Sequence, residues 1–453
     1  MTEDRVLTSS AQDASWLLHE LVPDSAAHNL CRAYQVIGQL DVPALHKAWR
    51  QVLGRHDILR TVLVELDGRP RAYVSVGYDA ERSFIELTAV GPPSAADRVC
   101  AHWAATRLDL DQPPPARLVV VRQAPGEHRV LIVLHDAVAD EESMSIVVGE
   151  LSAGYAAATG STRDRGPVAV PVPEQGERLR YADFARSQRQ WQTTPGGRFE
   201  LGWWVDALTP APPPLELPVD RSRPPVPSAA GGLAPFDLGR DAAAALAEFC
   251  AATGVTPQAT LLAAVQSLLH RYTGEDRIAV AVPASIRPRT GYASVVGPFT
   301  NTLVLCGDLS DEPAFEELAG RTERQLRDAV AHRDVPFDQV VQAIRVPRDP
   351  RRTPLHDVRL VMTPKRAIDL ELYGTLVRRM PVHNGSARAD LTVVVDRVAP
   401  ALTGALEYRS CLFEPQSARR IVEQLDTVLT RALAAPSTPV ARLPLETVER
   451  LRR

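Results

Sequence analysis

The spacing of apolar and polar residues alternates between helical and strand-like along most of the chain. In VPALHKAWRQVL, residues 42–53, apolar positions recur every three or four residues, which predicts a helix with one buried face. RHDILRTVLVEL and RAYVSV then become strand-like, with a turn at Asp67–Pro70 between them. ARLVVVRQ and HRVLIVLH are apolar runs rich in valine and joined by APGE, so we predict a hairpin over residues 116–135.

The second run of this hairpin ends in a cluster of charged and polar side chains. Residues 130–143 read VLIVLHDAVADEES, and beyond Ser143 the apolar residues return at helical spacing. Asp140 is placed to cap the first turn of that helix, while Glu141 and Glu142 are favourable near its positive end. The cluster is therefore predicted to lie on a turn that joins a strand to a helix.

The second half of the chain repeats this alternation of elements. The spacing predicts helices over 241–253 and 256–272, followed by the strand IAVAVPAS and a loop around GPFTNTLVL. A chain of 453 residues is too long for one ordinary core, so we predict two α/β lobes. The proline-rich residues 210–227 are interpreted as an extended linker between them. The expected ranges are 1–175 for the N-terminal lobe, 176–230 for the connection and linker, and 231–453 for the C-terminal lobe.

Composition excludes several classes of protein. The net charge is only −4 and arginines are dispersed among as many acids, so no nucleic acid partner is indicated. No signal segment and no run of about 18 apolar residues occurs, which argues against export and against membrane insertion. Scattered cysteines without a CxxC pair predict neither a disulfide framework nor a zinc site, and they fit a reducing cytoplasm; they are Cys31, Cys100, Cys250, Cys306 and Cys411.

Eight short stretches, taken in order, resemble the condensation domains of nonribosomal peptide synthetases. They are TSSAQDASWLL, GQLDVPAL, RHDILRT, YADFA, LELPVDRSRP, VGPFTNTL, HRDVPFD and RDPRRTPL, and they span nearly the whole chain. The resemblance implies an α/β fold of two chloramphenicol-acetyltransferase-like lobes arranged in a V. It also implies a central tunnel that carrier-bound substrates enter from opposite faces.

The family's signature, H-H-x-x-x-D-G, falls on His135–Glu141, which reads HDAVADE. His135 and Asp140 agree with it, whereas Asp136 replaces the second histidine and Glu141 replaces the glycine. An imidazole accepts a proton near neutral pH, while a carboxylate is the weaker base unless burial or neighbouring acids raise its pKa. Two interpretations therefore stay open: Asp136 takes part in bond formation or another proton transfer, or it is a non-catalytic remnant.

The resemblance also implies roles for neighbours of Asp136. The family pairs the signature aspartate with an arginine, which here corresponds to Asp140 with Arg287 in VPASIRP. Ser143 matches a serine of the family. Asp136 and His135 are the candidate catalytic residues, although His135 is expected mainly to brace the turn. Glu141 is grouped with these structural residues, although the sequence identifies no partner for it.

Three further residues are candidates for the tunnel lining. They are Arg60 and His56 in RHDILRT, and Asn301 in VGPFTNTL. Arginine and histidine in a helix-to-strand turn more often make local hydrogen bonds, and Asn301 is expected to bond loop backbone rather than substrate.

Three other interpretations of the cluster are weaker. A metal site built from His135, Asp136 and Asp140 is chemically possible, but the turn geometry opposes it and Arg287 would compete for Asp140. The H-x-x-x-x-D spacing of glycerolipid acyltransferases is present, yet nothing else supports that class. The heterocyclisation branch of the family has aspartate in the first histidine position, where this chain keeps His135.

Two hypotheses for the function follow from the resemblance. The first is a condensation-type acyltransferase, freestanding or excised from a larger synthetase, that forms an amide or ester in antibiotic biosynthesis. It needs no cofactor of its own, because its substrates arrive on the phosphopantetheine arms of peptidyl or acyl carrier proteins loaded by adenylation domains. The second is a non-catalytic module similar to the X domains, which recruit haem oxygenases to a carrier-bound peptide. That similarity is partial, because X domains have arginine where this chain has Asp136.

Overall fold

The computed structural model describes residues 4–22, 25–92, 94–160, 179–226, 228–346, 349, 351–363 and 368–445. These form two compact units. The first unit comprises Met1–Thr194, Ile286–Thr300 and Arg366–Ser386, and the second comprises Pro195–Ser285, Asn301–Lys365 and Ala387–Arg453. Each unit is therefore discontinuous in sequence, unlike the ranges 1–175, 176–230 and 231–453 expected above. The expected boundary at residue 175 lies outside the described residues.

The first unit contains a five-stranded sheet in the order β12-β2-β7-β6-β5 and a three-stranded sheet in the order β1-β4-β3. Its elements are β1 (Asp4–Val6), α1 (Ser10–Leu21), β2 (Asn29–Gly38), α2 (Val42–Arg55), β3 (Thr61–Leu66), β4 (Arg69–Val74), β5 (Phe84–Thr88), α3 (Ser94–Ala104), β6 (Ala116–Ala124), β7 (Glu127–His135), α4 (Glu141–Ala158), α5 (Tyr181–Gln192) and β12 (Thr375–Met380). The predicted hairpin is confirmed, because β6 and β7 pair antiparallel.

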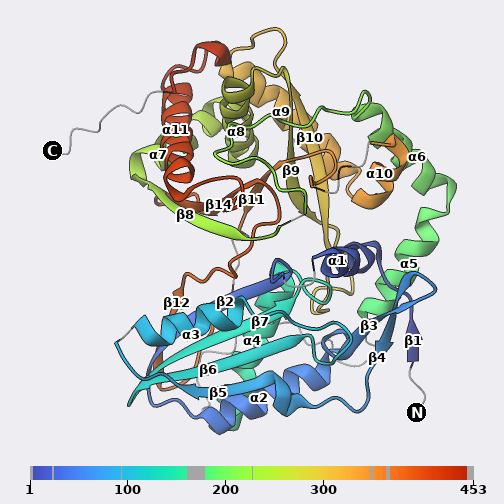
Figure 1. Cartoon of the computed structure of the whole chain (residues 1–453), viewed down its shortest axis with the longest axis vertical. Helices are drawn as coiled ribbons and strands as arrows, with labels where there is room; N and C mark the ends of the chain where they lie inside the picture. Colours follow the sequence, from blue (N-terminus) through green and yellow to red (C-terminus); the bar gives the residue numbers. More distant parts are fainter. Residues whose placement is uncertain are drawn as a thin grey trace. The chain divides into compact units, whose positions relative to one another are not determined.

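Helices cover both faces of the five-stranded sheet (Figure 1). Alternate residues of β2, β6 and β7 pack against α2 and α4 on one face, and the residues between them pack against α3 on the other. This explains why β7 is a continuous apolar run rather than an alternating one. The helix predicted over 42–53 is confirmed as α2, which Asp41 caps and which buries Leu45, Trp49 and Leu53.

The second unit is built on a six-stranded sheet in the order β10-β9-β11-β13-β14-β8. Its elements are α6 (Pro195–Ala207), β8 (Gly231–Leu238), α7 (Gly239–Thr253), α8 (Pro257–Thr273), β9 (Arg277–Ser285), β10 (Thr300–Asp308), α9 (Phe315–Ala331), α10 (Phe337–Ile344), β11 (Val358–Met362), β13 (Leu391–Arg397), β14 (Leu402–Arg409) and α11 (Pro415–Ala434). The helices predicted over 241–253 and 256–272 and the strand IAVAVPAS are confirmed as α7, α8 and β9.

The proline-rich residues 210–227 differ in part from the prediction. The described part is extended, with neither helix nor strand, but it packs within the second unit instead of forming a free linker. Leu215 and Leu217 are buried, and the Leu215 N–H donates to Asp357 Oδ2 at 3.0 Å. The physical reason is that apolar residues between the prolines still gain free energy by leaving water.

None of the helices in the described ranges combines the length and the apolar composition needed to cross a lipid bilayer.

Candidate functional site

The charged cluster lies on the turn between β7 and α4, as the sequence predicts. Strand β7 ends at His135 and α4 begins at Glu141. Asp140 is the N-cap of α4, because its Oδ1 accepts a hydrogen bond from the Ser143 N–H at 2.7 Å. Glu141 and Glu142 occupy the first helical turn, where carboxylates interact favourably with the helix dipole.

Asp140 is held by Arg287, the residue that the family resemblance assigns to it. Arg287 Nη2 lies 3.2 Å from Asp140 Oδ1, and both side chains are almost fully buried. The other carboxylate oxygen of Asp140 accepts from the Phe299 N–H at 3.0 Å. Arg287 also lies over the Phe299 ring, 4.1 Å from its centroid, and donates to the carbonyl oxygen of Tyr292 at 3.0 Å. This buried charge is thus matched by a counter-ion and by main-chain donors, as a stable buried pair requires.

Ser143 ties this arrangement to the loop before β10. Its hydroxyl donates to the Gly297 carbonyl at 2.8 Å and accepts from the Gly297 N–H at 3.0 Å. Arg287 Nη2 also donates to the Ser143 hydroxyl at 3.0 Å. We call Asp140, Ser143 and Arg287 the brace, because together they fix the turn to the 286–300 segment.

On the other side of the turn, Asp136 meets a histidine that the sequence did not single out. Its Oδ2 lies 2.9 Å from His28 Nδ1, and its N–H donates to the His28 carbonyl at 2.8 Å. Strand pairing explains this meeting, because Asn29 of β2 lies opposite His135 of β7, which places His28 opposite Asp136. The interaction joins residues 108 positions apart, and the only signal for it is the register of β2 against β7.

His135 is enclosed by other groups. Its Nδ1 accepts from the Ala137 N–H at 3.0 Å, and its Nε2 lies 3.1 Å from His19 Nδ1. The His28 ring is stacked against it, with centroids 5.7 Å apart. Burial and the adjacent guanidinium of Arg107 lower the pKa of His19 to about 4, so this ring is neutral at physiological pH. His135 is thus held within the turn, in keeping with the bracing role that the resemblance implies.

Glu141 has a partner that the sequence did not reveal. Its Oε2 accepts from Arg32 Nη2 at 2.9 Å, and Arg32 comes from the middle of β2. The Arg32 side chain is only 2% exposed, whereas that of Glu141 is 45% exposed. Arg32 Nη1 also donates to Ser145 Oγ and to the Ile368 carbonyl, each at 3.3 Å. The glutamate in the family's glycine position therefore neutralises a buried arginine.

Of the tunnel candidates, His56 is bonded inside the first unit. His56 Nε2 lies 2.9 Å from Glu150 Oε2, and both side chains are buried. Burial alone would raise the pKa of Glu150, but the hydrogen bond and charge of His56, together with Arg55, outweigh it and lower that pKa. His56 therefore joins α2 to α4 through a buried hydrogen bond.

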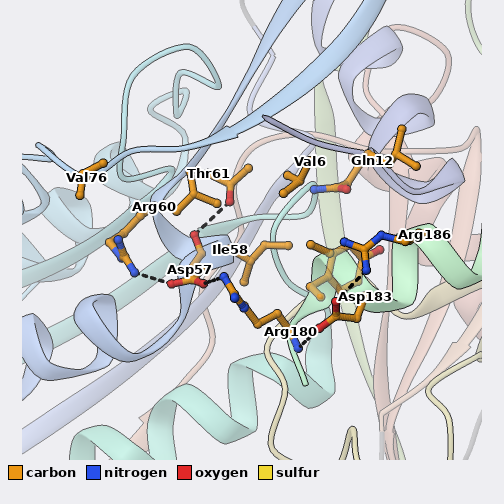
Figure 2. Close-up of a pocket in the computed structure, with 14 residues that line it drawn as sticks. Val6, Gln12, Asp57, Ile58, Arg60, Thr61, Val76, Arg180, Asp183 and Arg186 are labelled. Carbon is orange, nitrogen blue, oxygen red and sulfur yellow. Dashed lines mark hydrogen bonds and ion pairs between the residues drawn. The ribbon is translucent and has the colours of Figure 1, made fainter. Parts of the chain in front are cut away.

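Arg60 lines a pocket of about 480 Å³ in the same unit. Figure 2 shows its guanidinium beside Asp57, which also contacts Arg180. Arg60 additionally donates to the carbonyls of Leu53 and Ser75, at 3.1 and 3.2 Å. These are the local hydrogen bonds expected for an arginine in a helix-to-strand turn.

Asn301 belongs to the second unit. Its amide donates to the carbonyls of Arg333 and Val335, at 2.7 and 2.6 Å, and its Oδ1 accepts from the Phe337 N–H at 3.1 Å. The prediction that Asn301 bonds loop backbone is confirmed. Asn301 fixes the segment that leads into α10.

Within the described ranges, no group of three or more His, Cys, Asp or Glu side chains is arranged to hold a metal ion. Asp140, one ligand of the metal site considered above, is instead bonded to Arg287 and to backbone N–H groups.

Comparison with known proteins gives one consistent result. The family model described as "Condensation domain" matches residues 2–450. Phosphinothricin tripeptide synthetase PhsB of Streptomyces viridochromogenes is 34% identical over 445 residues, which cover 96% of this chain and 36% of that protein. Chondramide synthase cmdD of Chondromyces crocatus is 30% identical over 450 residues, which cover 98% of this chain and 11% of that protein. The chain thus spans only a minor part of these relatives.

Solved structures agree with this match. The X-domain from teicoplanin biosynthesis superposes with a TM-score of 0.84 and 25% identity over 98% of both chains. The first condensation domain of the calcium-dependent antibiotic synthetase gives a TM-score of 0.81 and 20% identity, covering 98% of this chain and 100% of that one. The predicted α/β fold with two sheet-containing lobes is confirmed by this likeness.

Proposed function

Because the chain belongs to the condensation domain family of nonribosomal peptide synthetases, we propose that it joins a carrier-bound acyl or peptidyl thioester to an amine or hydroxyl. The reaction forms an amide or an ester and releases the thiol of a phosphopantetheine arm. The partners are donor and acceptor carrier proteins loaded by adenylation domains, and the domain needs no cofactor of its own. All five cysteines lie in the described ranges and none is in a disulfide, which supports a cytoplasmic setting.

The observation that carries this proposal is the intact brace under an altered signature. Asp140, Ser143 and Arg287 match the family and hold the turn through buried charge-assisted hydrogen bonds. The turn thereby fixes the position of Asp136, whose side chain is 13% exposed, more than that of His135 at 1%. A proton acceptor must be reached by its substrate, so Asp136 is the signature residue best placed to position or deprotonate the acceptor.

An intact-mass assay with loaded donor and acceptor carriers tests this proposal. The carriers are taken from any synthetase genes found beside this one. We expect wild type to transfer the acyl group and Asp136→Ala to reduce transfer by at least about 100-fold, the usual minimum for loss of acid–base help. Ser15→Ala, in α1, is the matched control and retains transfer. Transfer by Asp136→Ala at the wild-type rate would refute the role of Asp136.

A second function is favoured by the likeness to the X-domain of teicoplanin biosynthesis, a protein also solved in complex with OxyB. In this alternative the chain binds a tailoring oxygenase and a carrier-bound peptide without forming a bond. The acid at Glu141, in the family's glycine position, is a feature that X domains share. Titration of the pathway's oxygenase with this chain separates the two functions: binding without transfer supports recruitment, and transfer supports catalysis.

A further inference from the structure

We propose that His28 supplies the imidazole that the signature has lost at position 136, with Asp136 as its positioning residue. This inference rests on the proposed acyl transfer but assigns the proton transfer to His28, so that Asp136 acts through His28 instead of on the acceptor itself. In the family signature the second histidine follows His135 directly, whereas here that position is Asp136. The imidazole is supplied here by His28, the residue before β2, and not by the residue that follows His135 at the end of the neighbouring strand β7.

The hydrogen bond between His28 and Asp136 defines how the ring is oriented. A carboxylate only accepts, so His28 Nδ1 at 2.9 Å from Asp136 Oδ2 must carry the proton. In the neutral ring the lone pair then lies on Nε2, the nitrogen that points away from the carboxylate. An aspartate that holds a histidine in one tautomer is the arrangement that general-base catalysis uses in hydrolases.

A main-chain hydrogen bond also joins His28 and Asp136. The Asp136 N–H donates to the His28 carbonyl at 2.8 Å, which continues the antiparallel pairing of β2 with β7. The His28 ring is also stacked against His135, with an interplanar angle of 17°. Both partners are thus preorganised by the sheet, so little reorganisation is needed at the moment of proton transfer.

His28 is the most exposed of the three rings, at 8% of the residue against 3% for His19 and 1% for His135. The His28 side chain is 10% exposed and Asp136 is 13% exposed, whereas His135 is 1% exposed. Both nitrogens of His135 are also engaged, by the Ala137 N–H and by His19. The titratable and charged groups around His28 are Asp136, His135 and His19, with Arg107 beside His19.

The chemistry balances without any further reactant. The amine or hydroxyl of the acceptor attacks the carbonyl carbon of the donor thioester, and His28 Nε2 takes the proton that the nucleophile loses. The new C–N or C–O bond forms as the C–S bond breaks. The proton then passes to the departing thiolate of the donor carrier, which regenerates neutral His28.

The test compares His28→Gln and Asp136→Asn with His102→Gln, a matched control on the exposed surface of α3. With carriers that wild type turns over, we expect His28→Gln to lower kcat by at least about 100-fold and the control to stay within about twofold. In His28→Ala, added imidazole should restore part of the transfer. If wild type transfers while His28→Gln keeps its rate, the role of His28 is wrong and the proposed acyl transfer still stands.

A second measurement does not depend on turnover. Nitrogen-15 NMR distinguishes the two tautomers of a neutral imidazole. We expect His28 to carry its proton on Nδ1 in wild type and to shift toward the Nε2 form in Asp136→Asn, whose amide can donate to Nδ1. The same tautomer population in both proteins would overturn the positioning role of Asp136. Absence of transfer by wild type with every carrier pair would refute the proposed function itself, and with it the base role of His28.

Discussion

The two sides of the turn between β7 and α4 are bonded in different ways. On the α4 side, Asp140 is matched by the buried guanidinium of Arg287, and the Ser143 and Phe299 N–H groups complete its contacts. On the β7 side, Asp136 contacts the His28 ring and His135 contacts the His19 ring. One side is a fixed ion pair and the other is a titratable network.

This difference explains how the signature can change without loss of the turn. The geometry of the turn depends on Asp140, Ser143 and Arg287, the three residues of the brace. The main chain of Asp136 also holds the turn, because its N–H bonds the His28 carbonyl at 2.8 Å whatever the side chain. A different side chain at position 136 is therefore compatible with the same backbone.

The largest expected effect is on the brace. Arg287→Met would leave the buried carboxylate of Asp140 without its counter-ion. We expect the free energy of unfolding of the first unit to fall by about 3–5 kcal/mol, the usual result of breaking one partner of a buried pair. Chemical denaturation followed by fluorescence measures this.

Arg289→Met is the matched control, because Arg289 lies in the same loop but is exposed. It should stay within about 0.5 kcal/mol of wild type. A loss of less than about 1 kcal/mol for Arg287→Met would show that the brace does not hold the turn.

A smaller effect, dependent on pH, is expected on the titratable side. The pKa of His19 is lowered to about 4, mainly by burial and then by Arg107. As the pH falls, His19 therefore takes up a proton near pH 6.5 in the unfolded chain but only near pH 4 in the folded chain. Stability from this group is full above pH 6.5 and is lost as the pH falls toward 4, by about 3 kcal/mol.

His19→Gln should remove this part of the pH dependence. The difference in unfolding free energy between pH 7 and pH 4.5 is measured for wild type, for His19→Gln and for His102→Gln. The exposed His102 control should keep the wild-type slope. An unchanged slope in His19→Gln would mean that another of the neighbouring groups, His28, His135 or Asp136, is responsible.

The sequence predicts the elements of the turn better than its partners. Apolar spacing and the capping position of Asp140 are local, so β7, α4 and the turn between them follow from adjacent residues. The pair of Asp140 with Arg287 came from the family resemblance, because no local pattern joins residues 147 positions apart. His28 and Arg32 depend on the register of β2 against β7, which a single sequence does not fix.

The same reason accounts for the proline-rich residues 210–227. Proline spacing correctly excludes helix, but it carries no information on whether an extended segment packs against a lobe. Leu215 and Leu217 gave the only local hint, since apolar residues between prolines favour burial. Segments 286–300 and 366–386, which join the first unit, have no local signal for that assignment.

The smallest effect concerns Glu141, which lies at the border between the two sides. Glu141→Gln removes the charge that neutralises Arg32 but keeps the size of the side chain. We expect a loss of about 1 kcal/mol, because Glu141 is half exposed and Arg32 keeps its bonds to Ser145 and to the Ile368 carbonyl.

Glu316→Gln is the matched control, since Glu316 is an exposed acid in the first turn of α9 and shares the interaction with a helix dipole. Any loss common to both variants measures the dipole, and the excess in Glu141→Gln measures the bond to Arg32. Equal losses would show that Glu141 acts only through the helix end. If the extra loss of unfolding free energy in Glu141→Gln is the same in 0.1 M and 1 M salt, the bond between Glu141 and Arg32 behaves as a buried pair, like that of Asp140 with Arg287. An exposed pair would be screened at high salt.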